Sequence, residues 1–173
     1  IGCVGAGAGG VEVLLAIEQR LRRDFSSLAL DHSKLEFHLF TDADEILVGY
    51  NRSIRRKFVR ILEARSIKVH TGHEVINVAP GRLSFASAPD VLVDEILWVT
   101  SAGAAEWLRN SGLDLNSQGF VLAEDTLQST SHVDVFAAGD IAHVVNHPRP
   151  KAGVFAVRQG PPLSENLRRA LTK

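Results

Sequence analysis

Apolar and polar positions follow strand-like and helix-like periods in a fixed order along the first part of the chain. Residues 1–4 form a short apolar run that ends in glycines, as a buried strand does. Residues 10–23 change to helical spacing, with apolar side chains on one side. Residues 35–40, 51–64 and 67–70 then predict a strand, a helix and a strand. This βαβαβ order predicts an α/β fold with a parallel sheet, because each helix connects two strands.

Residues 73–99 do not continue this alternation of strands and helices. Residues 75–78, 83–85 and 91–93 are short strand-like pieces, separated by Pro80-Gly81 and by an Ala-Pro-Asp turn. They predict a small antiparallel meander, after which residues 95–100 return as a strand.

The last seventy residues predict fewer regular elements. A short helix is expected around residues 105–110, followed by two weak strands. The apolar run 133–138 predicts a further strand, closed by Gly139 and Asp140. A helical region ends the chain, and we expect Pro161-Pro162 to divide it, because proline disfavours helical geometry before it.

The opening IGCVGAGAGG places glycines in the spacing Gly5-x-Gly7-x-x-Gly10 at the predicted passage from strand to helix. In that setting the first glycine permits a tight turn, the second lets the backbone approach a pyrophosphate, and the third lets helix and strand pack closely. The free N–H groups of the helix start, here around Ala8 and Gly9, then face the phosphates. The stretch predicts dinucleotide binding; the alternative is a merely tight turn.

Two acids accompany the glycines. Asp42 follows the second predicted strand, where an acid commonly binds the adenosine ribose, although its distance from Gly10 exceeds the customary spacing of about 20 residues. A solvated turn acid is the alternative. Glu12 is expected in the first helical turn, where the helix dipole alone could account for a carboxylate.

Basic residues crowd the second predicted helix. One of them could bind a 2′-phosphate and favour NADP, but charges opposite an apolar face are more often a solvated surface, and both interpretations stay open. The residues are Arg52, Arg55, Arg56, Lys57 and Arg60.

Composition narrows the function classes. The 173 residues are 45% hydrophobic, which suits a globular protein with a core. With 19 basic and 20 acidic residues the net charge is -1, which gives no general attraction to nucleic acid. No apolar stretch approaches the ~20 residues of a transmembrane segment. The single cysteine, Cys3, excludes an internal disulfide and a CxxC pair, and the histidines lack metal-ligand spacing. We expect a cytoplasmic location, with peripheral membrane association open.

The motifs at the two ends of the chain identify a family resemblance. With GxGxxGxE at the start and VFAAGD at residues 135–140, the sequence resembles the two-dinucleotide flavoproteins, which include pyridine nucleotide-disulfide oxidoreductases and type II NADH dehydrogenases. The tail KAGVFAVRQGPPLSENLRRAL is most similar to the NADH-dehydrogenase-like region fused in some bacteria to selenide, water dikinase. The resemblance implies a Rossmann-like NAD(P)H-binding domain at residues 1–102 and the returning C-terminal segment of a split FAD-binding domain at residues 103–173.

The resemblance also implies roles for individual residues. Glu12 would approach the nicotinamide end of NAD(P)H, and Asp140, after Gly139, would bind the ribityl chain of FAD. Lys151, Ala152 and Gly153 would start a helix that points its amides at the flavin. Ser101 stands where the family usually has glycine, near the nicotinamide. No side chain is expected to act as an acid or base.

The implied protein is an FAD-dependent NAD(P)H oxidoreductase that passes hydride from NAD(P)H to flavin and on to an unnamed acceptor. Because the chain starts with Ile and contains no Met, we expect it to be a segment of a longer protein, lacking an upstream FAD-domain segment. As an isolated segment, the chain should bind nucleotide but should neither retain flavin nor catalyse the reaction. A non-catalytic module that senses the NADH/NAD ratio is the alternative, and a fused kinase domain and a homodimer stay open.

Overall fold

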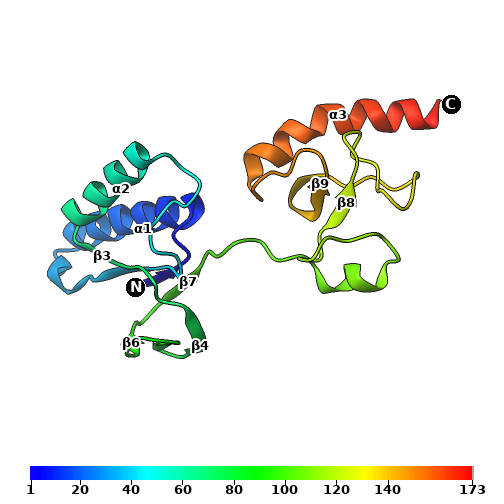
Figure 1. Ribbon diagram of the computed structural model, residues 1–173. Helices are drawn as coiled ribbons and strands as arrows, with labels where there is room; N and C mark the ends of the chain where they lie inside the picture. The colour runs from blue at the N-terminus through cyan, green and yellow to red at the C-terminus, as the bar shows by residue number, and fades with distance from the viewer. Residues whose placement is uncertain (173) are drawn as a thin grey trace. The chain divides into compact units, whose positions relative to one another are not determined.

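The computed structural model describes residues 1–172 as two compact units. The first unit covers Ile1–Ser101 and the second begins at Ala102 (Figure 1).

The first unit is built on a four-stranded parallel sheet. Its strands are β1 (Gly2–Val4), β2 (Phe37–Phe40), β3 (Ile67–His70) and β7 (Ile96–Trp98), in the order β3-β2-β1-β7. Cys3 of β1 is in register with Leu39 of β2 on one side and Leu97 of β7 on the other. The predicted α/β fold with a parallel sheet is confirmed.

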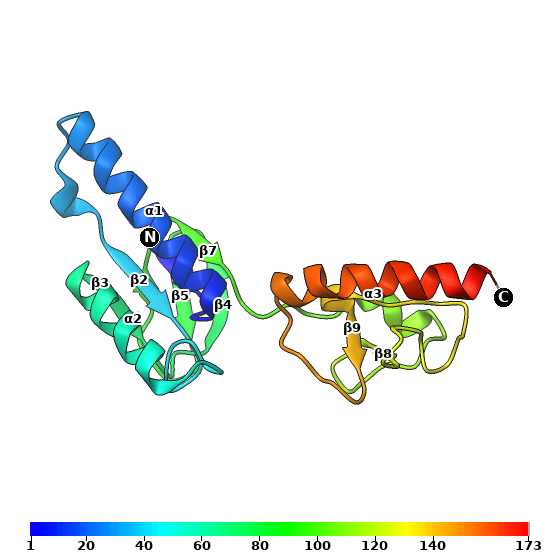
Figure 2. The same cartoon turned by 90° about the horizontal axis from the view of Figure 1, so that it is seen from above.

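Different layers cover the two faces of this sheet. Helices α1 (Ala8–Ser27) and α2 (Arg52–Ala64) lie on one face, and the antiparallel meander lies against the other (Figure 2). The meander consists of β4 (Val75–Ala79), β5 (Arg82–Phe85) and β6 (Val91–Leu92). Because successive side chains of a strand point to opposite faces, Cys3 packs under the helices whereas Val4 packs on Leu83 of the meander. Burial on both faces accounts for the nearly continuous apolar strands.

Local side-chain bonds set the ends of the helices. Helix α1 runs four residues past the predicted end, and its last turns are stabilised by the Arg20–Asp24 pair, with N···O 2.7 Å. A short 3₁₀ turn, η1 (His32–Lys34), follows. Helix α2 begins after Asn51, whose side-chain oxygen accepts a hydrogen bond from the Ile54 amide at 3.0 Å.

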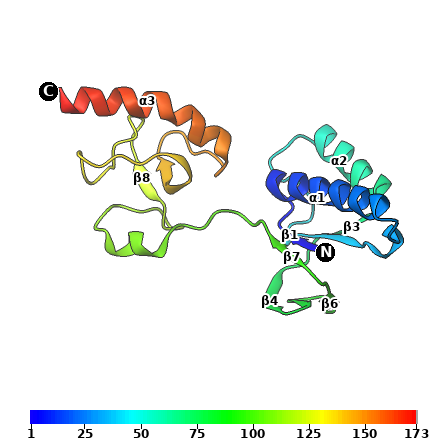
Figure 3. The ribbon, with the colours of Figure 1, turned by 180° about the vertical axis from the view of Figure 1, so that it is seen from behind.

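The second unit has a small core and short elements. It contains the 3₁₀ helices η2 (Glu106–Asn110) and η3 (Gly139–Ile141), strands β8 (Val121–Ala123) and β9 (Ala142–Val144), and helix α3 (Gly153–Leu171). The two strands form a parallel pair, and α3 packs against η3 (Figure 3). One cluster of buried residues in this unit consists of Leu108, Val121, Ala137 and Ala142.

The strand prediction for residues 133–138 was wrong. Val133 and Asp134 lie in a turn, closed by a hydrogen bond from the Val135 amide to the His132 carbonyl at 3.0 Å. Only Phe136 forms a bridge, with Gln128. The turn leaves too few extended residues for a strand, so Asp140 follows a loop rather than a strand and lies in η3.

The expected division at Pro161-Pro162 was also wrong, because α3 continues through both residues. Each proline removes one backbone donor from the helix. The acceptors left without these donors belong to Val157 and Arg158, which are both exposed to solvent. Water can therefore replace the two missing hydrogen bonds, and the helix continues.

Candidate functional site

The turn between β1 and α1 depends on glycine at two positions of close backbone approach. Gly5 has a φ of +110°, and a Cβ there would stand 2.1 Å from the Val99 carbonyl oxygen. A Cβ on Gly10 would stand 1.8 Å from the Gly5 carbonyl oxygen, and the Cys3 sulfur lies directly beneath. These two glycines hold α1 against the sheet.

Gly7 differs from these two glycines, because no heavy atom lies within 4 Å of the position its Cβ would take. It is the N-cap of α1 in an extended conformation and has no side chain to accept from the helix. The amides of Ala8, Gly9 and Gly10 therefore have no intrahelical acceptor. Open space, N–H groups without an intrahelical acceptor and the positive end of the helix dipole make Gly7 a candidate anion site.

The strand order of the sheet reverses beside this helix start. From β1 the chain proceeds to β2 and β3 on one side of the sheet and then crosses to β7 on the other side. The carboxyl ends of β1 and β7 meet at this reversal, where the Val99 amide donates to the Val4 carbonyl at 2.8 Å. In open α/β sheets, ligands bind at such a reversal. Ser101, exposed, follows β7 at the same edge.

Asp42 lies two residues beyond β2, at the edge that carries the glycine turn. The Gly5 amide donates to the Phe40 carbonyl at 2.9 Å, which fixes the two strand ends side by side. Asp42 itself is exposed, and the only hydrogen bond of its side chain within residues 1–172 is a long one of 3.5 Å from the Thr41 hydroxyl. Its carboxylate is therefore available to a ligand.

Glu12 does not lie in the first turn of the helix, contrary to expectation. Because α1 begins at Ala8, Glu12 is the fifth helical residue, and the first turn contains no acid. The helix dipole acts mainly within the first turn, so it does not account for this carboxylate. Glu12 is exposed and forms no ion pair within the described part of the chain.

The sequence did not reveal that residues 44–50 fold over the glycine turn. The Leu47 amide donates to the Ala6 carbonyl at 2.8 Å, and Ile46 and Leu47 are buried beside Ala6. The signal was the apolar Ile46-Leu47-Val48 within a polar connection. This loop holds the turn in place from the side opposite β7.

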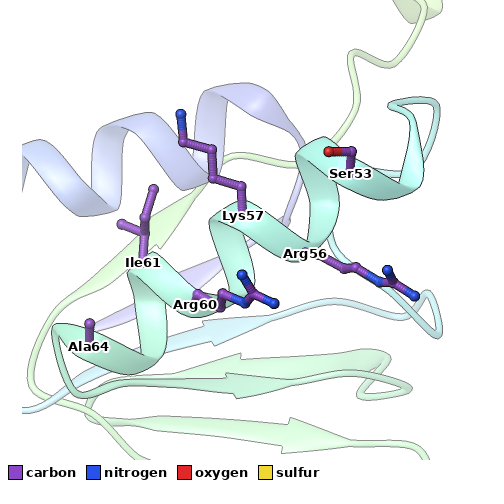
Figure 4. A pocket seen from close by; sticks show the side chains of 6 residues that line it. All are labelled: Ser53, Arg56, Lys57, Arg60, Ile61 and Ala64. Atoms are coloured by element: carbon purple, nitrogen blue, oxygen red, sulfur yellow. The ribbon is translucent and has the colours of Figure 1, made fainter.

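Most of the basic residues of α2 are exposed to solvent. Arg55 pairs with Glu45, whereas the other four are exposed and form no ion pair within residues 1–172. Most of them line a shallow hollow of about 520 Å³ made by α2 alone (Figure 4). Its lining is Ser53, Arg56, Lys57, Arg60, Ile61 and Ala64.

In the second unit the structure brings the predicted Gly139, Asp140 and Lys151 around one small hollow. Gly139 has a φ of +72°, and its amide donates to the Gln159 side chain at 2.6 Å. Asp140 is exposed at the rim. Gln159 was missed, since nothing in the sequence distinguishes it from other polar helix residues.

Lys151 is held by two contacts before α3 begins. Its ammonium donates to the Ala142 carbonyl and lies 4.0 Å from the centre of the Phe120 ring. Burial lowers the pKa of Lys151, and the nearby Asp140 carboxylate opposes this shift. Ala152 is the N-cap and Gly153 the first residue of α3, so the helix starts as predicted, with no side chain capping its amides.

Residues 1–172 hold neither a cluster of metal-ligating side chains nor a membrane-spanning helix. No group of three or more His, Cys, Asp or Glu side chains is placed to bind a metal ion there. No helix within the same range is long and apolar enough to cross a bilayer.

The parallel sheet, the glycine turn and the reversal of strand order define a Rossmann-like fold. Residues 1–160 match the family model of pyridine nucleotide-disulphide oxidoreductases, and the chain belongs to that family.

Two curated relatives are similar to most of this chain. It is 26% identical over 149 residues to the type II NADH:quinone oxidoreductase of Haemophilus influenzae, covering 84% of this chain and 33% of the relative. It is 23% identical over 155 residues to a probable NADH dehydrogenase of Dictyostelium discoideum, covering 88% and 34%. The chain thus spans about a third of the length of these relatives.

Solved structures share the fold. A water-forming NADH oxidase from Lactobacillus brevis, bound to NADH, has a TM-score of 0.72 at 19% identity, covering 96% of this chain and 36% of that one. An FAD-dependent pyridine nucleotide-disulphide oxidoreductase from Desulfovibrio vulgaris has a TM-score of 0.72 at 22% identity, covering 97% and 42%.

Proposed function

We propose that this chain is the NAD(P)H-binding region, with a returning segment of the FAD-binding region, of an FAD-dependent NAD(P)H oxidoreductase. The observation that carries the proposal is Gly7: its site is open and bordered by free amides, while Gly5 and Gly10 are closed by backbone contacts. A pyrophosphate fits this arrangement, because its charge and acceptor oxygens complement the start of α1.

In the proposed complex each site residue has one task. The amides at Gly7, Ala8, Gly9 and Gly10 bind the pyrophosphate of NAD(P)H. Asp42 accepts from ribose hydroxyls at the end of β2, where its carboxylate is free of strong contacts. Glu12 and Ser101 lie toward the nicotinamide end, and the family resemblance supports this assignment.

The second unit supplies part of an FAD site under this proposal. Asp140 binds the ribityl chain, and the start of α3 at Gly153 directs its amides at the flavin. The pair β8–β9 also supports an additional segment, because two parallel strands with open edges are marginal by themselves. Strands from an upstream FAD-domain segment would complete this sheet and the flavin site.

When bound, the two cofactors supply the hydride transfer, and the protein supplies position and electrostatic environment. The names of the relatives, an NADH dehydrogenase and an NADH:quinone oxidoreductase, support redox chemistry with NADH. The similarity of the tail from Lys151 supports a fusion to selenide, water dikinase, which we include in the proposal. We also propose a cytoplasmic location, peripheral to a membrane if the acceptor is a lipid-soluble quinone, and leave a homodimer to direct measurement.

The test is the visible spectrum of the protein extended upstream to its natural start, recorded anaerobically before and after NADH and then NADPH. A flavin band bleached by either donor supports the oxidoreductase and identifies the donor. A flavin band that neither donor bleaches would favour a nucleotide sensor. Ser101→Gly would then be the first variant in which to look for reduction of the flavin. A protein without a flavin band would overturn the FAD assignment of Asp140.

A further inference from the structure

Three histidines meet on the sheet face that is turned toward the meander. His38 lies on β2, His70 on β3, and His73 in the turn that follows β3. The rings of His38 and His70 stack with centroids 5.3 Å apart, and Phe40 stacks on His70 at 4.6 Å. Phe85 of β5 closes the cluster against His73 at 5.3 Å. His38 is only 8% exposed, so the cluster belongs to the interface between sheet and meander.

One hydrogen bond joins the two central rings. The Nδ1 atom of His38 lies 3.0 Å from the Nε2 atom of His70, and one of the two must donate while the other accepts. The Nε2 atom of His38 lies 3.4 Å from the carboxylate of Glu36. Neutral rings satisfy the bond, and so does a pair carrying one extra proton. A second extra proton puts an N–H group on both facing nitrogens and breaks it.

The surroundings disfavour that second proton. Burial lowers the pKa of both His38 and His70, and repulsion by His38 and His73 lowers that of His70 further. On the sheet side the neighbouring charges are Glu36, Lys68 and the amino group of Ile1. The meander presents the uncharged Phe85, while its Arg82 and Asp90 lie near each other at 3.7 Å.

The histidine-bearing strand end is bonded to the segment that carries Asp42. The Thr41 amide donates to the His70 carbonyl at 3.0 Å, and the His73 amide donates to the Thr41 carbonyl at 2.8 Å. The Gly72 amide donates to the Ala43 carbonyl at 3.0 Å. Residues 41–43 are therefore held by three backbone hydrogen bonds to the segment 70–73.

We propose that the His38–His70 pair is an acid-sensitive latch: when the pair gains its second extra proton, residues 41–43 detach from the end of β3 and nucleotide binding at Asp42 weakens. The consequence for binding rests on the proposed dinucleotide site, whereas the latch itself does not. The sign follows from the lowered pKa values. The closed form binds fewer protons than the open form, so the latch is fully closed above the ordinary histidine pKa of about 6.5 and loosens as pH falls below it.

Hydrogen exchange tests the latch directly. We expect the protection of the Thr41, Gly72 and His73 amides, corrected for intrinsic exchange, to fall about tenfold or more from pH 7.5 to 5.5, since uptake of one proton changes an equilibrium about tenfold per pH unit. The Val99 amide, bonded to Val4 at 2.8 Å, is the internal reference and should keep its protection. Equal protection of the three amides at both pH values would overturn the latch.

Variants separate protonation from general acid sensitivity. His70→Gln keeps an uncharged donor beside His38 and should remove the pH dependence; His38→Gln is the second choice if the first does not fold. His32→Gln, at an exposed histidine in η1, is the matched control and should behave as the parent. Loss of protection at pH 5.5 that persists in His70→Gln and His38→Gln would also contradict the proposal.

Binding of ADP-ribose completes the test, because its pyrophosphate is esterified at both ends and keeps its charge over this pH range. The dissociation constant should rise about tenfold from pH 7.5 to 5.5 in the parent and stay constant in His70→Gln. A constant value in the parent would contradict the coupling. Absence of binding at pH 7.5 would contradict the proposed dinucleotide site instead. The latch would in that case still be tested by the hydrogen exchange of the Thr41, Gly72 and His73 amides.

Discussion

Replacing Gly7 by alanine should separate ligand binding from folding. Gly7 has φ -71° and ψ -179°, which alanine adopts without strain, and nothing lies within 4 Å of the added Cβ. Alanine is a poorer N-cap than glycine, but it also reduces the entropy of the unfolded chain by about 0.4–1 kcal/mol, so the two effects nearly cancel. We expect the free energy of unfolding to change by less than about 0.5 kcal/mol.

The same methyl group should weaken nucleotide binding strongly. It would stand in the space through which a phosphate reaches the amides of α1. A hydrogen bond to a charged group contributes about 1.5–3 kcal/mol, so the loss of one raises the dissociation constant of ADP-ribose about 10- to 100-fold. Calorimetric titration gives the affinity, and urea unfolding gives the stability of the same preparation.

Gly10→Ala is the matched comparison, because its Cβ would stand 1.8 Å from the Gly5 carbonyl oxygen. The backbone must move to admit it, at a cost of about 2 kcal/mol or more. If Gly7→Ala bound ADP-ribose as tightly as the parent, the phosphate site at Gly7 would be wrong. If Gly10→Ala were as stable as Gly7→Ala, the close backbone contact at Gly10 would be wrong.

Three further predictions concern other residues. Glu12→Ala should lower the affinity for NADH about tenfold, while ADP-ribose binding, measured by the same titration, changes less than about twofold. An equal loss for both ligands would contradict the assignment of Glu12 to the nicotinamide end. Glu18→Gln should lower the free energy of unfolding in urea by about 1–3 kcal/mol, because the buried carboxylate pairs with Arg65 at 2.8 Å and also with Arg22. Asp24→Asn, in the exposed Arg20–Asp24 pair, should lower it by less than about 0.5 kcal/mol. Similar losses in the two variants would contradict the distinction between the buried and the exposed pair. Burial raises the pKa of the Cys3 thiol to about 11. Iodoacetamide at pH 8 should therefore label the native chain about 100-fold or more slower than the urea-unfolded chain. Rapid labelling of the native chain would contradict the packing of Cys3 under Gly10.

The first unit was predictable because its local signals agree with its topology. Each strand of the parallel sheet is an apolar run, and each crossover helix has a clear apolar side, so periodicity alone gives the order. The glycine spacing is equally direct, because Gly5 and Gly10 are fixed by backbone contacts that a side chain would obstruct. The meander was predictable from its turn residues, such as Pro80-Gly81.

The second unit was less predictable because its local signals conflict with its tertiary structure. The apolar run at 133–138 resembles a strand, but the turn at Val133-Asp134 removes the residues a ladder needs. Pro161-Pro162 indicates a break, yet solvent exposure at Val157 and Arg158 lets α3 continue. Neither exposure nor long-range bridging can be read from local sequence.

The candidate site shows a similar limit. Positions defined by backbone geometry, such as Gly7, follow from spacing, whereas the start of α1 decided the place of Glu12 in the helix. Leu47 was missed because its role depends on a loop that folds back over Ala6, a contact between residues far apart in sequence. The pairing of His38 with His70 joins two strands and has no local signal either.

Amide mapping of ADP-ribose binding by nuclear magnetic resonance, on the isotopically labelled chain at pH 7.5, is the decisive experiment for the proposed nucleotide site. We expect the largest shifts at the amides of residues 5–10, and smaller ones near Asp42 and at residues 99–101. Shifts confined to the second unit, or no shifts at saturating ADP-ribose, would contradict the assignment of the glycine turn as the nicotinamide-dinucleotide site.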